Sequence, residues 1–408
     1  MPDFQFDPLS RNFSADPYSI YARLRDAEEP YFFEQQNMWL LSRYDDVSAV
    51  TTDPSMVRSL VGFKSAKDLK AMQREANWHD MPYHERVVQF SLLDSDGDIH
   101  RRLRKQVFGS FLGANVAGLE LMVQSYVDRL LDSLVDRERI DFIGDFAAHI
   151  PGFVIGKLLG APEADCPQLR LWSEQIVQFF DVDRSDERKD IAENATKEFF
   201  FYLEDLKNER KSAPKNDLIS KMLVDEEAGF YSEDEFISTC MLILMAGHGS
   251  TIDVLGSGMH TMMNHPDAAR SLRAKPDMLP TAIQEIFRYE PPLPFFHRHA
   301  TREFELRGRV YPAGTTFGLL YGAANRDPRC FERAGEFLID RDPNRHLAFG
   351  RGAHLCLGNH LARLNMKVIF GTLLRRFSAF EFLDKEVVYK RGLSIRGPEA
   401  LNISWKKC

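Results

Sequence analysis

One very long predicted helix in the middle of the chain restricts the fold more than any other feature. It begins at 232–235, Ser-Glu-Asp-Glu, a capping box in which the serine and the last glutamate each satisfy a free backbone N–H group. No proline follows until Pro266, so the helix can extend over about 30 residues, where roughly 8 to 20 is usual. Because its middle is apolar on all sides, we expect it to lie buried in one large core.

Helical and strand patterns occupy different parts of the chain. Apolar residues at helical spacing dominate two segments, 95–300 and 358–376. Short runs with strand patterns, separated by turns, occupy 30–42, 302–320 and 378–408. The sequence contains no repeat, low-complexity tract or Gly/Ser-rich linker. The pattern predicts a mainly α protein with small β-sheets (α+β), folded as one domain over residues 1–408.

Charge and hydrophobicity narrow the class of partner. The 408 residues carry 52 basic and 60 acidic side chains, a formal net charge of −8, whereas nucleic-acid-binding proteins usually have a basic surplus. The longest nearly apolar run, 236–246, is about half of the roughly 20 residues that cross a bilayer. The N-terminus lacks the basic flank and apolar stretch of a signal peptide. We therefore predict a cytoplasmic protein that binds neither membrane nor nucleic acid.

One of the five cysteines lies in a setting that suits a metal ligand. Cys356 follows a run in which three glycines fall within nine residues, so the backbone can approach a bulky group. It also precedes a predicted helix, whose free N–H groups and dipole favour a thiolate. The other four show no C-x-x-C pair and are expected to be buried free thiols without a role; they are Cys166, Cys240, Cys330 and Cys408.

The segment from Phe349 to Arg363 resembles, position for position, the haem-binding signature of the cytochromes P450: Phe-Gly-x-Gly-x-His-x-Cys-x-Gly-x-x-Leu-Ala-Arg. The resemblance implies a bound haem b with the Cys356 thiolate as axial ligand of the iron. Phe349, Gly350 and Gly358 would then shape the loop around the haem. In this family the thiolate is known to push electron density toward the iron and favour O–O cleavage.

Other residues match the family in the same order. Glu285 and Arg288 resemble its Glu-x-x-Arg pair, and Arg341 resembles the arginine that completes a buried structural network. His100 and Arg104 lie one helical turn apart, so both can reach one anionic group. The resemblance implies that four side chains bind the haem propionates: His100, Arg104, Arg298 and His354.

The long helix contains a departure from the family. Its segment 246–251, Ala-Gly-His-Gly-Ser-Thr, resembles Ala-Gly-x-(Asp/Glu)-Thr-Thr, in which the acid and the next alcohol feed protons to bound dioxygen. Gly249 replaces the acid and Ser250 replaces the threonine, so a hydroxyl is kept and a carboxylate is lost. We expect Asp253, at i+4 from Gly249, or ordered water to replace the proton route; a poorly coupled site is the alternative. The catalytic candidates are Gly247, Ser250, Thr251 and Asp253.

The resemblance implies a haem-thiolate monooxygenase that inserts one oxygen atom from O2 into a hydrophobic or amphipathic small molecule, by hydroxylation or epoxidation. Secondary-metabolite tailoring is one such use. Electrons would come from NAD(P)H through ferredoxin reductase and ferredoxin, or through a flavodoxin, to a monomeric protein. A basic cluster on an acidic chain can attract such an acidic partner to the thiolate side of the haem. The cluster consists of Arg101, Arg102, Lys105, Arg351 and Lys367.

The substrate pocket is expected at the family's substrate-contacting positions: the loop 55–95, the helix at 242–250, the stretch 293–297 and the turn near Ile395. Leucine and phenylalanine side chains there would form an apolar wall, and His297 would offer a polar group. The pocket residues assigned in this way are Ala246, Leu293, Phe295, Phe296 and His297.

Two rival functions fit the same motifs. A peroxygenase driven by hydrogen peroxide tolerates a missing distal acid, although no arginine stands at that position to anchor a fatty-acid carboxylate. A non-catalytic haem-binding sensor would change its spectrum with ligand and form no NAD(P)H-dependent product.

Overall fold

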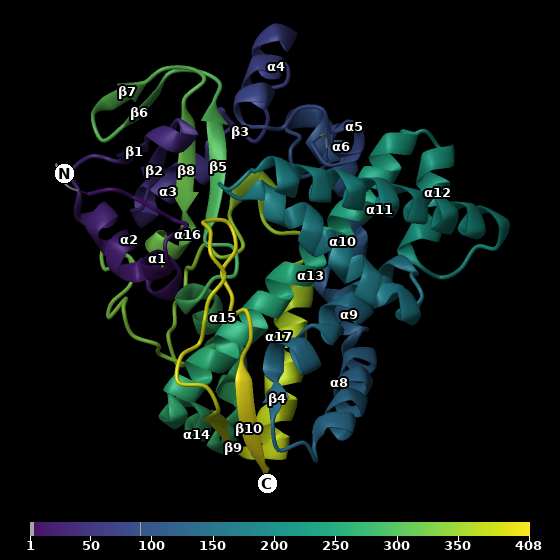
Figure 1. Cartoon of the computed structure of the whole chain (residues 1–408), viewed down its shortest axis with the longest axis vertical. Helices are drawn as coiled ribbons and strands as arrows, with labels where there is room; N and C mark the ends of the chain where they lie inside the picture. Colours follow the sequence, from purple (N-terminus) through teal and green to yellow (C-terminus); the bar gives the residue numbers. More distant parts are fainter. Residues whose placement is uncertain (1–3, 90) are drawn as a thin grey trace. The chain divides into compact units, whose positions relative to one another are not determined.

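The computed structural model describes residues 4–89 and 91–408, and its longest element is helix α13, Glu233–Asn264 (Figure 1). Both halves of the predicted capping box are present. Ser232 Oγ accepts a hydrogen bond from the Glu235 N–H at 3.2 Å, and Glu235 Oε2 accepts one from the Ser232 N–H at 2.9 Å. The helix ends just before Pro266, whose ring cannot continue it. The long helix is therefore confirmed, at 32 residues.

Two helical stretches are long and apolar enough to cross a membrane: Phe142–Leu159 and Glu233–Asn264. The longest nearly apolar run, 236–246, covers only part of the second stretch and none of the first, because mean hydropathy over a longer window tolerates interspersed polar side chains. In each stretch 72% of the apolar window is buried inside the structure. Burial against other protein segments accounts for the apolar character of these helices.

The chain divides into two compact units, each built from separated segments. Unit 1 consists of Met1–Met56, Ala117–Ala148 and Ser250–Cys408, and unit 2 of Val57–Val116 and His149–Gly249. The division falls inside α13, so the two halves of this helix belong to different units. A single domain over residues 1–408 stays a prediction. Phe90, in the expected substrate loop 55–95, lies outside the described residues.

Unit 1 contains the β-structure. In its main sheet four strands are neighbours in the order β1 (Tyr31–Phe33), β2 (Met38–Leu41), β8 (Thr316–Leu320) and β5 (Phe295–Ala300), and only β2 and β8 are parallel. A second, antiparallel sheet has the order β4 (Ile140–Asp141), β10 (Asn402–Lys407) and β9 (Phe377–Phe382). The main sheet also includes the short strand β3 (Met56–Val57), and β6 (Phe304–Leu306) and β7 (Arg309–Tyr311) form a separate hairpin. The predicted fold class, mainly α with small sheets, is confirmed.

Strand β5 lies inside the segment 95–300 that the sequence analysis assigned to helix, so that boundary is wrong. Three prolines between residues 291 and 294 stop the helical pattern, because proline lacks an N–H donor and disfavours helix in the residue before it. The strand then pairs with β8, with Phe296 opposite Leu319 and Arg298 opposite Phe317. The prolines end the helical pattern, and pairing with β8 then holds 295–300 as a strand.

The helices of unit 1 pack against the sheet and against the second half of α13, where a Cβ on Gly258 would lie 3.0 Å from Phe370 and 3.1 Å from Ile286. Tyr44, Val47 and Val50 of α3 are buried with Phe317 and Leu319 of β8 in one apolar cluster. Helix α17 packs on α8 and α15. These helices are α1 (Arg11–Ala15), α2 (Pro17–Asp26), α3 (Tyr44–Thr52), α8 (Glu120–Leu134), α14 (Pro266–Ala274), α15 (Leu279–Tyr289), α16 (Tyr321–Ala324) and α17 (Asn359–Arg376).

Unit 2 is helical. Its long helix α11 packs on α10 and α5, and the Glu193 carboxylate of α11 accepts hydrogen bonds from the Tyr83 and His84 N–H groups, both at 3.0 Å. These bonds cap the free N–H groups at the start of α5. Besides the first half of α13, the helices are α4 (Ala66–Glu75), α5 (Pro82–Val87), α6 (Gly97–Phe108), α7 (Gly113–Ala117), α9 (His149–Leu159), α10 (Cys166–Val177), α11 (Asp186–Ser212) and α12 (Leu218–Glu227).

Candidate active site

The loop that carries Cys356 lies between a short 3-10 turn, Gly352–His354, and the start of α17. Gly350 and Gly352 have φ values of 65° and 70°, which favour glycine. The Cys356 N–H donates to the Phe349 carbonyl at 2.8 Å, and Asn359 Nδ2 donates to the Cys356 carbonyl at 2.8 Å. These bonds fix the backbone on both sides of the cysteine, whose side chain is exposed.

The loop rests on an aromatic base. The ring of Phe349 lies 4.5 Å from the ring of Phe287 in α15, and the guanidinium of Arg363 lies 4.4 Å from the centre of the Phe349 ring. Arg363 is also held by Asn359 Oδ1 at 2.6 Å. An exposed thiol on a loop fixed in this way fits a haem iron, which accepts a soft thiolate ligand.

The remaining cysteines differ from the expectation in part. Cys240 is buried and Cys166 is half-buried; burial raises the pKa of both thiols, that of Cys166 to about 11, so neither is a thiolate near neutral pH. Cys330 and Cys408, however, are exposed rather than buried, because they lie in a surface turn and at the chain end.

Glu285, Arg288 and Arg341 form one network in unit 1. Arg288 donates to the two carboxylate oxygens of Glu285 at 2.7 Å each, and Arg341 Nε donates to Glu285 Oε2 at 3.1 Å. Arg288 also donates to three backbone carbonyls, at 2.7 to 2.9 Å; these belong to Asn325, Ala334 and Glu336. The network therefore ties α15 to the irregular segment that leads to the Cys356 loop.

The expected propionate-binding residues fall into two pairs. In unit 1, Arg298 of β5 is buried and His354 is half-buried. In unit 2, His100 is buried and Arg104 is half-buried one turn later on α6. The start of α6 is fixed by the Asp96 carboxylate, which accepts the Arg58 N–H at 2.8 Å. Each pair offers cationic or donor groups suited to a carboxylate.

Helix α13 has an open face at the expected catalytic segment. Ala246 is exposed and Gly249 and Ser250 are half-buried, whereas His248 and Thr251 are buried. A Cβ on Gly247 would lie 2.5 Å from Ile155 Cγ1, so glycine is required there by packing. A Cβ on Gly249 would meet no atom within 4 Å, so the absence of an acid at this position has no packing cause.

The family motif predicts no role for His248, which the structure places in the interior of unit 2. Its Nδ1–H donates to the Leu244 carbonyl at 2.9 Å, and burial lowers the pKa of its ring, which is therefore neutral. A Cβ on Gly152 of α9 would lie 2.5 Å from His248 Nε2. The side chain thus fills space between helices of unit 2, on the side of α13 away from Ala246.

Asp253, one turn beyond Ser250, is 1% exposed and forms an ion pair with Lys390 at 2.6 Å. A Cβ on Gly397 would lie 2.3 Å from Asp253 Oδ1. No local pattern links these three positions, which are up to 144 residues apart (397 − 253), so the sequence analysis missed both contacts.

The residues expected to line the substrate pocket differ in their burial and in their neighbours. Phe295 is buried beside Gly318 of β8, and Phe296 packs against the apolar cluster that includes Tyr44 and Val47. Leu293 is half-buried just before the strand. His297 is half-buried with its ring 5.1 Å from that of His299.

The expected basic cluster is largely paired with carboxylates. In unit 2, Arg101 pairs with Asp98, and Arg102 donates to Glu235 at 2.5 Å. In unit 1, Lys367 pairs with Glu120 at 2.8 Å. Lys105 is exposed and forms no ion pair with any described residue.

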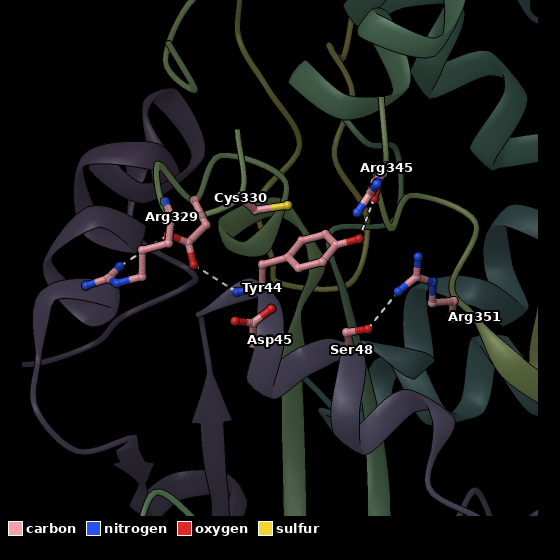
Figure 2. A pocket seen from close by; sticks show the side chains of 8 residues that line it. Tyr44, Asp45, Ser48, Arg329, Cys330, Arg345 and Arg351 are labelled. Carbon is pink, nitrogen blue, oxygen red and sulfur yellow. Dashed lines mark hydrogen bonds and ion pairs between the residues drawn. The ribbon is translucent and has the colours of Figure 1, made fainter. Parts of the chain in front are cut away.

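Arg351 lies at the edge of a polar pocket of about 420 Å³ in unit 1, where it donates to Ser48 Oγ at 2.9 Å. Figure 2 shows Arg345 and Arg351 on one side of the Tyr44 ring and Arg329 on the other. Tyr44 donates through its hydroxyl to the Arg345 carbonyl at 2.7 Å. Arg351 directly precedes the Gly352–His354 turn, so it connects this pocket to the segment that carries Cys356.

The chain is similar to known proteins over most of its length. The family model "Cytochrome P450" matches residues 165–396. The polyketide biosynthesis cytochrome P450 PksS of Bacillus subtilis (strain 168) is 31% identical over 100% of both chains. The cytochrome P450 monooxygenase PikC of Streptomyces venezuelae is 33% identical over 100% of this chain and 95% of its own. The crystal structure of P450BioI in complex with hexadec-9Z-enoic acid ligated acyl carrier protein has a TM-score of 0.89 at 30% identity, over 97% of this chain and 99% of that one.

The chain belongs to the cytochrome P450 family. It is a haem-thiolate monooxygenase in which Cys356 supplies the axial thiolate. Like other members, it acts on a small-molecule substrate and receives electrons from a redox partner.

Proposed function

We propose that this P450 oxidises amphipathic molecules with long apolar chains, of polyketide or fatty-acid origin, as a cytoplasmic monomer. PksS carries polyketide biosynthesis in its name, and the P450BioI structure contains a hexadecenoic acid. The open face of α13 carries the proposal, because Ala246 is exposed on a helix that is otherwise mostly buried. Leu293 and Ile395, both half-buried, supply apolar side chains for such a chain in unit 1.

The haem-binding candidates and Ser250 have defined parts in this proposal. The haem, when bound, activates O2 and transfers one oxygen atom to the substrate. Cys356 would hold the iron, and the pairs Arg298 with His354 and His100 with Arg104 would neutralise and orient the propionates. The Ser250 hydroxyl can both donate and accept a hydrogen bond, so it can hold and pass a proton. The room beside Gly249 suits ordered water as the proton source.

We infer that the redox partner is an acidic ferredoxin or flavodoxin. Arg101, Arg102 and Lys367 are already neutralised by neighbouring carboxylates, so Lys105 and Arg351 supply most of the attraction. Exchanging either for glutamate should slow reduction by ferredoxin by about tenfold at low salt, because exposed charges act mainly on association. Reduction by dithionite should not change. Equal rates for wild type and both variants would contradict the inference.

The proposed function is tested with two probes, myristic acid and a polyketide macrolactone. Purified protein is incubated with NADPH, ferredoxin and ferredoxin reductase, and in parallel with hydrogen peroxide alone. A hydroxylated or epoxidised product only in the first reaction supports the proposal. Product with peroxide alone supports the peroxygenase, which the missing acid at position 249 favours. A substrate-induced spectral shift without product in either reaction supports a sensor, and each of the last two outcomes overturns the proposal.

A further inference from the structure

The segment 389–398 forms a closed loop in unit 1. The Lys390 N–H donates to the Gly397 carbonyl at 2.9 Å, and Tyr389 and Pro398 form an isolated β-bridge. Ile395, which the proposed function places beside the substrate, lies within this loop. The position of Ile395 therefore depends on what holds the base of the loop.

One stripe of α13 holds that base. Asp253 contacts both closing residues: its carboxylate lies 2.6 Å from Lys390 Nζ and leaves no room for a side chain at Gly397. A Cβ on Gly256 would lie 2.8 Å from Pro398 Cγ. One turn further, the Tyr389 hydroxyl hydrogen-bonds to His260 Nδ1 at 2.8 Å. Residues 253, 256 and 260 recur at helical spacing, so they lie on one face of the helix.

The residue that follows Ile395 is fixed just before the start of β5. The Arg396 N–H donates to the Pro292 carbonyl at 2.9 Å, and Arg396 Nε donates to Glu290 Oε2 at 2.8 Å. Arg396 also donates to the Ser14 carbonyl at 2.8 Å. Residue 395 is therefore placed next to the stretch that contains Leu293.

We propose that Asp253 and Lys390 are a positioning pair that sets substrate selectivity. Asp253 lies three residues after Ser250, so the pair links the turn of α13 that handles protons to the loop that carries Ile395. Loss of the pair loosens the base of the loop, which the Tyr389 and Arg396 contacts still hold in part, and shifts the Ile395 side chain, while Ser250 keeps its place in the helix. The proposal rests on the proposed function for the substrate wall and on the described contacts for the pair.

This role differs from the proton relay that the sequence predicts for Asp253. A relay needs a carboxylate that exchanges protons with neighbouring water, whereas Asp253 is 1% exposed and accepts a charge-assisted hydrogen bond from Lys390. A positioning pair controls where the substrate is oxidised. A relay controls how many electrons yield product.

The experiment compares wild type with Asp253→Asn, Lys390→Met, the double variant and Lys390→Arg. Lys385→Met is the matched control, because Lys385 is exposed on the same C-terminal segment and no ion pair is described for it. Amide hydrogen exchange of the peptide covering 388–398 is measured in each haem-loaded protein. Binding of 4-phenylimidazole and of imidazole is followed by the Soret shift. Product positions and product per electron are measured with myristic acid.

Both single variants should raise exchange of the loop by about tenfold, and the double variant no further, since one interaction is lost in each case. Affinity for 4-phenylimidazole, which reaches the walls of the pocket, should change severalfold, while that for imidazole stays constant. The product pattern should shift, while product per electron should stay within about twofold of wild type. Lys390→Arg should restore the wild-type loop exchange, 4-phenylimidazole affinity and product pattern.

Unchanged loop exchange in both single variants overturns the proposal. A tenfold fall in product per electron with an unchanged product pattern also overturns it and favours the relay. If Asp253→Asn loses haem, Lys390→Met decides, because methionine keeps the packing of the lysine stem. If wild type converts no probe, the proposed function fails, and hydrogen exchange still decides whether the pair holds the loop.

Discussion

Arg288 and Glu285 face each other across one turn of α15 with two hydrogen bonds of 2.7 Å, and neither side chain has any exposed surface. A charged pair of this kind compensates the loss of hydration only while both partners are present. The backbone carbonyls that Arg288 holds all lie between residues 325 and 336, ahead of the Cys356 loop. Damage to the pair therefore leaves a buried charge unmatched and releases the segment that leads to the haem ligand.

Glu285→Gln should lower the free energy of unfolding by about 3 to 5 kcal/mol, because the buried guanidinium groups of Arg288 and Arg341 lose their common counter-charge. Haem content should fall in parallel. Chemical unfolding and the carbon monoxide difference spectrum of the reduced protein measure the two effects. Arg270→Ala is the control: Arg270 pairs with Asp267 at the same spacing on α14, but both are exposed, so no loss of haem is expected. Equal stability of Glu285→Gln and wild type would contradict the network's role.

Replacing Gly247 or Gly249, both in segment 246–251 of α13, with alanine should change the stability of the protein in opposite directions. Gly247→Ala places a methyl group 2.5 Å from Ile155 Cγ1 and should cost about 1 to 3 kcal/mol through overpacking. Gly249→Ala meets no atom within 4 Å and should stabilise the helix by up to about 1 kcal/mol. Thermal unfolding measures both. Ile155→Ala added to Gly247→Ala should recover part of the loss; a loss that persists in the double variant would mean that the contact with Ile155 is not its cause.

The sequence alone predicts those features whose residues lie close together along the chain. Cys356 was assigned because its glycines and the following helix lie within a dozen residues, and the capping box at Ser232 is equally local. The spacing of Glu285 and Arg288 is visible in the sequence, but their burial depends on carbonyls about 40 to 50 residues away, a tertiary relationship that no local pattern encodes. For the same reason the ion pair between Asp253 and Lys390 could not be predicted from the sequence, since contacts between distant segments follow from packing rather than periodicity.

Two histidines, His84 (buried) and His346 (half-buried), should make the protein sensitive to mild acid. Burial lowers the pKa of His84 to about 3, in an aromatic setting with the ring of Trp78 at 5.1 Å. Burial, together with the positive charges of Arg363 and Arg288, lowers the pKa of His346 to about 3. The folded state then binds fewer protons than the unfolded state, whose histidines titrate near 6.5. Stability is therefore complete above pH 6.5 and is lost as the pH falls toward 3.

Each histidine should lower the free energy of unfolding by about 2 kcal/mol between pH 7 and pH 5, because one pKa unit corresponds to about 1.36 kcal/mol. Denaturant unfolding at several pH values measures the slope. His84→Gln and His346→Gln should each flatten it, and the double variant should flatten it further. His360→Gln, on the exposed surface of α17, should leave the slope unchanged. A slope that is the same in wild type and the double variant would rule out these two rings as its source.

An acid placed at position 249 should restore the carboxylate that segment 246–251 of α13 lacks. Because a Cβ there meets no atom within 4 Å, Gly249→Asp can be accommodated in the folded helix. A carboxylate beside the Ser250 hydroxyl gives a second group that takes protons from water and passes them on, so product per electron should rise severalfold. Ser250→Ala should lower it by about tenfold, and Ser250→Thr, which keeps the hydroxyl, should not. NADPH consumption and product are measured together with myristic acid, and the peroxide-driven reaction is the control, because it should gain little from the new acid. If product per electron rises in Gly249→Asp and stays high when Ser250→Ala is added, the acid acts without the hydroxyl. If product per electron does not rise in a Gly249→Asp protein that keeps its haem, water already supplies protons at a sufficient rate.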